Sequence, residues 1–475
     1  MNIGVDATAL YGRYNGVEYA LWNLLCGLNA IESETARDDG QNPNRYTVYV
    51  PRDGPSREQL KVFDARWRWV RLPFLGREKA RRVWWQQMQL PRQLQRDGCD
   101  LLHAPTYVSP LRARVPIVLT VYDLIALSHP QFATPLNRLH YGALMKLSIR
   151  AARRVIVPSE PVRKEIARRV PRAASKTRVV PLGVEPLFFA EHDEKTRDEV
   201  RARYGLPPRF LLFVGNFEPK KNLPRLLKAL DLIPDAPPLI LAGGARAWNN
   251  GAPNRLDLHA PHSQPDTAQT IVTGARGIES DAAETDAAQT DAAQSQGRAT
   301  EAASKNGVTR GATVRDATVR GATARGATVC DATVRDATAG GAAAGARSIG
   351  YVRRRDLPVL YSLCEAFVFP SLAEGFGLPV LEALAAGVPV VTSTHVPLPN
   401  LADAARLCDA HDPHSIARAI RAVLEPDCRD ELRRGPQFAR PYTWRRAAET
   451  TLDVYREAVA YGGAVAYREA AARPK

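Results

Sequence analysis

The chain has 475 residues, 45% of them hydrophobic, and its 65 lysines and arginines against 50 acidic residues give a net charge of +15. This length exceeds one ordinary core and predicts two globular domains. Six scattered cysteines with no C-x-x-C pair disfavour a zinc site or a disulfide framework and fit a reducing compartment. There is no leader-like start and no run of about 18 uncharged apolar residues, so we expect a cytoplasmic protein without a membrane span.

The excess positive charge gathers in one stretch. Residues 150–178 contain ten basic and two acidic side chains. Such a stretch would attract the phosphates of nucleic acid, of an anionic membrane surface or of a phosphorylated acceptor, and a solvated arginine-rich face is equally consistent with it. Because no helix-turn-helix, finger or RNA-binding motif is present, we expect no nucleic-acid partner.

The first part of the chain alternates short apolar runs with amphipathic segments. Helices are predicted at residues 19–28 and 144–154. Alternation of strands and helices predicts a parallel, doubly wound sheet, here in a first domain over residues 1–190. The predicted strands are residues 1–6, 46–50, 101–103, 117–121, 155–157 and 179–184.

A second series of strands begins near residue 210. Each is tied to a helical segment, so a second doubly wound domain is predicted over residues 205–442. Ligands in such folds bind beyond the carboxyl ends of the strands, which predicts a cleft between the two domains. The predicted strands are residues 210–215, 238–242, 366–370 and 388–391.

Residues 250–346 break this pattern, since they are rich in Ala, Thr, Gly, Asp and Arg and nearly lack large apolar side chains. A five-residue repeat starts at Asp281, Asp286 and Asp291, and a second set of repeats begins at Arg310. A β-solenoid would need a large apolar residue in each turn. The composition instead predicts a disordered insertion, which cannot bury enough surface to offset its ordering entropy.

The most informative stretch runs from residue 369 to residue 391. A strand is predicted to end at Phe369, and a loop with Gly375 and Gly377 leads into a helix that contains Glu382. The start of such a helix suits a diphosphate, although carboxylates near it are often only capping charges. Glu374 and Glu382 are separated by about 12 Å of mostly helical rise, too far for most glycosidase carboxyl pairs, which lie roughly 5–9.5 Å apart.

This stretch resembles the E-x7-E motif of retaining GT-B glycosyltransferases of family 4, in the mannosyltransferase-like branch, with Glu374 and Glu382 as its two carboxylates. Residues 215–223 are similar to the donor-phosphate segment of that family, and Trp444 matches the position before its last helix. The resemblance covers nearly the whole chain except the insertion. It implies two Rossmann-like domains facing a cleft, with a helix over residues 443–460 crossing back to the first.

The resemblance also implies roles for individual residues. Glu374 would contact the transferred sugar and, with Lys221, act in catalysis, while Glu382 would bind the nucleotide ribose. Lys220 and Lys221 would hold the diphosphate leaving group, and a solvated basic turn is the alternative for these two lysines. The family retains the anomeric configuration of its donor and needs no metal or cofactor. The donor contacts would come from Gly215, Lys220, Gly375, Phe376, Gly377, Leu378 and Glu382.

On the acceptor or sugar side the resemblance implies Gly16, His103, Tyr122 and Asp123. Many relatives have a histidine where this chain has Tyr122, which puts a catalytic role there in doubt. A satisfied histidine at a strand end is the alternative interpretation of His103. The glycine-rich loop of the family is reduced around Gly16, and Asn400 replaces a glutamate usual in relatives.

The function expected from these features is transfer of a hexose, with GDP-mannose as the first candidate donor, to a growing cell-surface polysaccharide or lipid-linked glycan. The basic stretch would dock the enzyme peripherally at the inner face of an anionic membrane. The alternative is a catalytically inactive GT-B-like scaffold that binds a nucleotide-sugar or glycan. A Rossmann oxidoreductase is disfavoured because no G-x-G-x-x-G follows the first strand.

Overall fold

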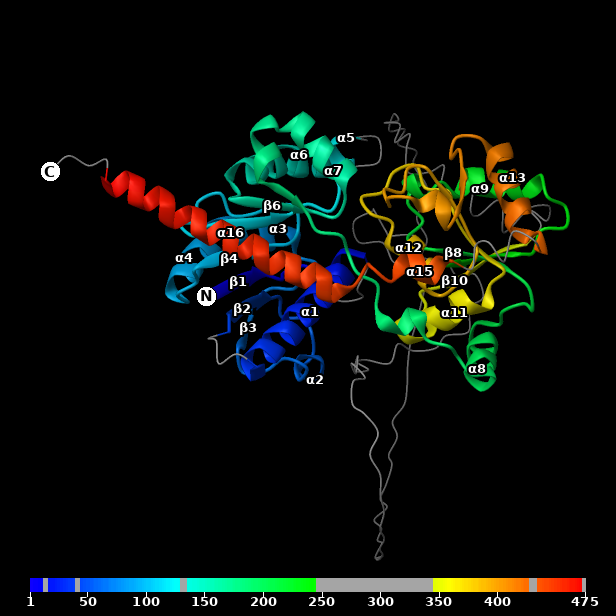
Figure 1. Ribbon diagram of the computed structural model, residues 1–475, viewed down its shortest axis with the longest axis horizontal. Helices are drawn as coiled ribbons and strands as arrows, with labels where there is room; N and C mark the ends of the chain where they lie inside the picture. The colour runs from blue at the N-terminus through cyan, green and yellow to red at the C-terminus, as the bar shows by residue number, and fades with distance from the viewer. Residues whose placement is uncertain (12–15, 39–42, 129–134, 245–344, 427–433, 472–475) are drawn as a thin grey trace, which may run out of the picture. The chain divides into compact units, whose positions relative to one another are not determined.

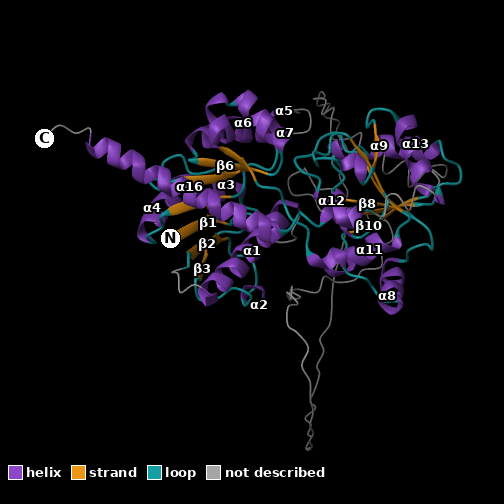
Figure 2. Cartoon of the chain, viewed as in Figure 1, coloured by secondary structure: helices purple, strands orange, loops and turns teal. Residues whose placement is uncertain are grey.

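The computed structural model contains two parallel β-sheets flanked by helices (Figures 1 and 2). The α/β, doubly wound prediction is therefore confirmed. The predicted insertion lies outside the described residues except for its last positions, where Ala346 already begins a strand. The structure describes residues 1–11, 16–38, 43–128, 135–244, 345–426 and 434–471.

The N-terminal sheet has seven parallel strands in the order β3-β2-β1-β4-β5-β6-β7. The strand order reverses between β1 and β4, which places the switch point of the sheet at their carboxyl ends. The strands are β1 (Asn2–Asp6), β2 (Arg45–Val50), β3 (Trp67–Arg71), β4 (Leu101–Ala104), β5 (Ile117–Thr120), β6 (Arg154–Val157) and β7 (Thr177–Val179). The helices are α1 (Gly16–Asp38), α2 (Arg57–Leu60), α3 (Lys79–Trp84), a π-helical turn (Trp85–Gln89), α4 (Leu90–Arg96), α5 (Ile125–Ser128), α6 (Pro135–Ala151) and α7 (Glu160–Arg169).

The C-terminal sheet repeats this topology with six parallel strands in the order β10-β9-β8-β11-β12-β13. Its switch point lies between β8 and β11. The strands are β8 (Leu211–Val214), β9 (Leu239–Ala242), β10 (Ala346–Gly350), β11 (Ala366–Phe369), β12 (Val390–Ser393) and β13 (Arg406–Cys408). The helices are α8 (Glu194–Tyr204), α9 (Leu223–Asp231), α11 (Leu357–Leu363), α12 (Leu378–Ala385), α13 (Pro413–Leu424) and α15 (Gly435–Ala439).

Burial explains why the central strands are apolar along their whole length. The strands β8, β9 and β11 are almost completely buried because helices cover both faces of the sheet. Val184 and Phe188 already pack in this C-terminal core, earlier than the predicted boundary at residue 190. Helix α8 also belongs to this half, since Arg203 forms an ion pair with Asp356 at 3.0 Å.

The last helix, α16 (Trp444–Ala471), packs against α1 and contacts β4, β5 and β6 of the N-terminal sheet (Figure 1). It follows a parallel bridge between Val184 and Thr443. Buried Tyr455 lies on its inner face, and Glu457 forms ion pairs with Arg154 at 2.9 Å and Arg178 at 3.0 Å. The helix is longer than predicted, because it continues beyond residue 460.

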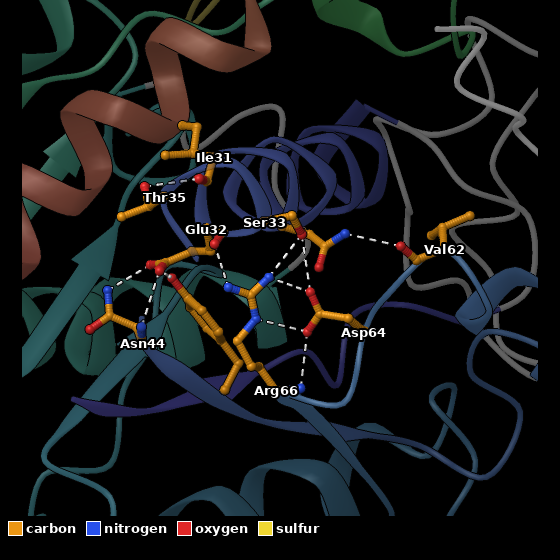
Figure 3. Close-up of polar contacts among 10 residues, drawn as sticks. Ile31, Glu32, Ser33, Thr35, Asn44, Val62, Asp64 and Arg66 are labelled. Carbon is orange, nitrogen blue, oxygen red and sulfur yellow. Dashed lines mark hydrogen bonds and ion pairs between the residues drawn. The ribbon is translucent and has the colours of Figure 1, made fainter. Parts of the chain in front are cut away.

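A polar cluster fastens the end of α1 to the neighbouring sheet edge (Figure 3). Arg66 donates to Ser33 Oγ at 2.8 Å and to Asp64 Oδ1 at 2.9 Å. The Glu32 carboxylate accepts from Asn44 Nδ2 at 2.6 Å and from the Tyr46 hydroxyl at 2.9 Å. These charges and polar groups satisfy one another, which makes the cluster structural.

Candidate functional site

The candidate site is a cleft of about 720 Å³ lined by residues from both halves of the chain. Its walls follow the carboxyl ends of strands near both switch points, where doubly wound sheets bind ligands. His103 and Glu382 do not line it. The predicted site residues that do line it are Gly16, Tyr122, Asp123, Gly215, Lys220, Lys221, Glu374, Gly375, Phe376, Gly377 and Leu378.

At the centre of the C-terminal wall, Lys221 Nζ lies 2.6 Å from Glu374 Oε1. The Ser371 hydroxyl donates to the same oxygen at 2.5 Å. Burial raises the pKa of Glu374, but the positive charges of Lys221 and Lys220 and these hydrogen bonds outweigh it and hold the pKa below its usual range. Glu374 is therefore an ionised carboxylate inside the cleft.

The turn that carries the two lysines is locked by Asn222, which adopts a left-handed conformation with φ of 64°. Its side-chain amide donates to the carbonyl oxygens of Pro370 at 3.0 Å and Ala410 at 2.6 Å. The turn after β8 is thereby tied to the end of β11 and to the loop after β13. This explains how Lys221, after one strand, meets Glu374, after another.

Lys220 interacts with carboxylates from both walls of the cleft. Burial lowers its pKa, but the carboxylates of Asp123, Glu374 and Glu218 outweigh burial and raise the pKa above its usual value. Asp123 belongs to the N-terminal half, and Glu218 Oε2 lies 3.6 Å from Lys220 Nζ. The lysine is therefore a cation already balanced by acidic side chains.

The loop from Glu374 to α12 needs both of its glycines. A Cβ atom on Gly375 would lie 2.0 Å from the carbonyl oxygen of Tyr122, and Ser159 Oγ donates to the Gly375 carbonyl at 2.8 Å. Gly377 has a φ of 98°, and a Cβ there would lie 2.4 Å from Val396. The loop thus packs closely on the N-terminal half while bringing the start of α12 to the cleft, where backbone N–H groups favour an anion.

Glu382 lies behind this wall and is 3% exposed. Arg354 Nη1 lies 2.8 Å from its carboxylate, and the Tyr361 hydroxyl donates to it at 3.3 Å. Arg354 also pairs with Glu185 at 3.1 Å and lies over the ring of Tyr19 at 4.5 Å. Burial raises the pKa of Glu382 despite the neighbouring guanidinium. Its ribose contact stays a prediction, and a ribose would have to share this carboxylate with Arg354.

His103 is fully buried away from the cleft. Its Nε2 lies 2.9 Å from Thr120 Oγ1, and its Nδ1 lies 2.7 Å from the Tyr455 hydroxyl of α16. Burial lowers its pKa to about 3. The structure therefore places His103 away from the cleft, and the alternative of a satisfied structural histidine fits these contacts.

Several basic side chains of residues 150–178 are paired with acids, while Arg150, Arg153, Arg154 and Lys176 line one hollow on the N-terminal half. Arg154 and Arg178 are engaged by Glu457 of α16. Arg163 pairs with Glu160 at 2.6 Å, and Arg169 pairs with Glu165 at 2.8 Å. The sequence count overstated the free charge because it could not include an acid from the end of the chain.

The sequence analysis missed the N-terminal wall of the cleft, which includes Arg77, Lys79, Arg82 and Gln86. The last three lie three, four or seven positions apart, a helical spacing that could have revealed a shared face. Within the described ranges, no group of three or more His, Cys, Asp or Glu side chains could hold a metal ion. No helix in that part of the chain is both long and apolar enough to cross a membrane.

Two doubly wound sheets with a cleft at their switch points define the GT-B class of glycosyltransferases, and solved structures share this fold. Sucrose-phosphate synthase from Thermosynechococcus elongatus matches with a TM-score of 0.64 and 18% identity over 97% of this chain and 99% of that one. Anabaena HepE in complex with UDP and glucose matches with a TM-score of 0.61 and 16% identity over 96% and 99%.

Two family descriptions match the sequence itself. "Glycosyl transferases group 1" matches residues 335–436, and "Glycosyltransferase Family 4" matches residues 40–188. Together they cover more than half of the chain, which belongs to the group 1, family 4 glycosyltransferases.

Curated relatives are similar over shorter stretches. The O-antigen chain mannosyltransferase B of Escherichia coli is 40% identical over 113 residues, which are 23% of this chain and 30% of that protein. The D-inositol 3-phosphate glycosyltransferase of Salinispora tropica is 43% identical over 114 residues, 22% of this chain and 23% of that protein. The chain thus spans less than a third of the length of these relatives.

Proposed function

We propose that this glycosyltransferase moves a hexose from a nucleotide-sugar to a growing polysaccharide or lipid-linked glycan, with retention of the anomeric configuration and without a metal ion. The observation that carries the proposal is the ionised Glu374 beside Lys221 at the switch point of the C-terminal sheet. A fixed negative charge there can stabilise positive character that develops at the anomeric carbon.

The leaving diphosphate would be held by cationic and backbone groups of the same wall. Lys220 and Lys221 supply charge, and the start of α12 supplies N–H groups. As the sugar departs, the new negative charge on the diphosphate would be met by groups already in place. This arrangement is the reason for proposing that no metal ion is required.

The proposed donor is GDP-mannose, and the O-antigen mannosyltransferase of E. coli supports this choice. The proposal includes peripheral contact with the inner face of an anionic membrane through Arg150 and Arg172, which are exposed. Co-sedimentation with anionic vesicles should then fall when both residues are replaced by glutamine. Equal sedimentation of the variant would contradict this contact.

A donor panel tests the activity. Purified full-length chain should turn over one radiolabelled nucleotide-sugar in the presence of EDTA, and NMR of the product should show the anomeric configuration of the donor. An inverted product or a requirement for metal would contradict the proposed mechanism. Tight binding of a nucleotide-sugar without any turnover would instead favour the inactive-scaffold alternative.

The role proposed for Glu382 has its own test. Glu382→Ala should raise the Kd for free GDP by about tenfold, because a hydrogen bond from a ribose hydroxyl to a charged group is lost. Calorimetric titration of the folded variant measures this change. Unchanged affinity for the free nucleotide would exclude a ribose contact.

A further inference from the structure

The N-terminal wall of the cleft presents one cationic helix face. Lys79, Arg82, Val83 and Gln86 line the cleft from α3 and the π-helical turn that continues it. Their spacing of three, four and seven positions puts them on the same side of a helix. Arg81 points elsewhere, since it does not line the cleft and pairs with Glu78 at 3.2 Å.

Arg77 adds a third positive charge at the tip of the loop before α3. Two hydrogen bonds order this loop: the Leu75 N–H donates to Glu78 Oε2 at 2.7 Å, and the Gly76 N–H donates to Asp53 Oδ1 at 2.7 Å. Three cationic side chains therefore stand on a fixed segment of the N-terminal wall.

The two walls differ in charge balance. On the C-terminal wall, Lys221 is matched by Glu374 and Lys220 by Glu218. On the N-terminal wall, neither Arg77 nor Arg82 forms an ion pair with a carboxylate among the described residues. Asp123, an acid that lines that wall, accepts hydrogen bonds from the Tyr107 hydroxyl at 3.3 Å and from the Ile125 N–H at 3.0 Å.

Mutual repulsion within the face supports the same conclusion. The pKa of Lys79 is lowered first by burial and then by the positive charge of Arg82. An anion held between these side chains would offset the repulsion between Lys79 and Arg82. The guanidinium group of an arginine can form two hydrogen bonds to the oxygens of one phosphate. A single carboxylate carries one negative charge, fewer than the three positive charges of Arg77, Lys79 and Arg82.

We propose that the face formed by Arg77, Lys79 and Arg82 is a binding site for a phosphate or diphosphate group of the acceptor. This inference rests on the proposed function, in which the acceptor enters from the N-terminal side of the cleft. It narrows the acceptor to a phosphorylated glycan or a glycan linked through a phosphate to a carrier.

The test uses inorganic pyrophosphate as the probe and the full-length chain saturated with GDP, so that the donor side is occupied. Titration calorimetry should show pyrophosphate binding at low ionic strength. The double variant Arg77→Gln/Arg82→Gln should weaken it about tenfold or more, because charge-assisted contacts are lost. Arg81→Gln is the matched control on the outer face and should change the Kd by less than about twofold. Arg82→Lys should retain part of the affinity.

The outcomes separate this inference from the proposed function. Loss of pyrophosphate binding upon saturation with GDP, or equal affinity in the double variant, overturns the acceptor site and leaves the glycosyltransferase proposal standing. If GDP fails to bind while pyrophosphate binding still depends on Arg77 and Arg82, the anion site stands and the proposed donor fails.

A second arm identifies the source of the phosphate. Farnesyl diphosphate in mixed micelles binding more tightly than pyrophosphate, with both affinities lowered in Arg77→Gln/Arg82→Gln, would indicate a lipid carrier. Equal affinity for the two probes would indicate a soluble phosphorylated acceptor. Both results support the phosphate site and differ only in what carries the phosphate.

Discussion

The ion pair between Lys221 and Glu374 joins two side chains that come from loops after different strands. This ion pair preserves a negative charge, because burial alone would raise the pKa of the Glu374 carboxyl, whose side chain is 9% exposed. The pair therefore keeps a negative charge in the cleft before any substrate arrives. Ser371 adds a hydrogen bond that fixes the carboxylate oxygen.

We expect Glu374→Gln to lower turnover of the nucleotide-sugar by about 100-fold or more, because the amide keeps the shape but not the charge that acts in the transition state. Glu218→Gln is the control, since Glu218 is another cleft carboxylate paired with a lysine, at 3.6 Å. Steady-state rates and thermal melts of both variants provide the measurement. Similar rates in the two variants would remove Glu374 from the catalytic role.

Arg354 forms ion pairs with two buried carboxylates, those of Glu382 and Glu185. We expect Arg354→Met to reduce the free energy of unfolding by about 3 kcal/mol, because two buried carboxylates lose their shared cation. Urea denaturation measures the loss. Arg355→Met serves as the control, because the Arg355 side chain is 55% exposed and lies 3.8 Å from Asp356, and should cost less than about 0.5 kcal/mol.

Adding Glu185→Gln to the Arg354→Met variant should recover part of that stability, since it removes one of the unpaired charges. A double variant no more stable than Arg354→Met alone would mean that the arginine acts mainly through its contacts with Tyr19 and Phe188.

At the scale of elements, the apolar runs predicted the central strands well. The strands β8, β9 and β11 were found because burial on both faces makes them continuously hydrophobic. The edge strand β3 was missed, since its Trp-Arg-Trp-Val-Arg sequence mixes buried and exposed positions. Residues 179–184 were predicted as one strand, yet β7 ends at Val179 and the chain then runs to the bridge at Val184.

In the candidate site, too, some residues could be predicted from the sequence and others could not. The residues from Glu374 to Leu378 were found because they are contiguous and their glycines mark a special backbone. The cationic face on α3 was missed because its members matter only through a cleft that another part of the chain completes. The positions of Glu382 and His103 depend on Arg354 and Tyr455, which are distant in sequence and carry no local signal.

The contact of His103 with α16 predicts a pH dependence of stability. Its native pKa of about 3 lies below the ordinary value of 6.5, so the native state keeps the ring neutral. Below about pH 6.5 the unfolded chain binds a proton that the native state does not, and stability should fall by up to about 1.4 kcal/mol per pH unit until the native pKa is reached.

His103→Gln should lack this contribution, because glutamine can reach the same two partners without titrating. The measurement is the difference in free energy of unfolding between wild type and variant from pH 7.5 to pH 4.5. A difference that stays constant over this range would mean that His103 is not held neutral.

At the scale of the whole molecule, the connection between β9 and β10 has a minimum length. The two strands are adjacent and parallel, with Leu239 paired to Ala346, so the chain between them must return along the full sheet. Such a crossover needs about a dozen residues or more. The predicted insertion lies within this connection and, except for its last positions, outside the described residues.

We expect that replacing residues 250–344 with a Gly/Ser linker of about 20 residues preserves folding and GDP binding, because loop-closure cost changes only logarithmically with length. Thermal melts and GDP titration of this variant provide the measurement. Unfolding with this linker would show that the replaced segment contributes to the C-terminal sheet.

The packing of α16 on the N-terminal sheet also determines when that sheet can be completed during synthesis. Tyr455 is made 352 residues after His103, with which it shares a hydrogen bond. At about 5–20 residues per second, a ribosome needs roughly 20–70 s to cover that distance. During this interval the surfaces of α1 and β4–β6 that α16 will cover stay exposed to solvent. We therefore expect chaperones to bind the nascent N-terminal half until the end of the chain emerges.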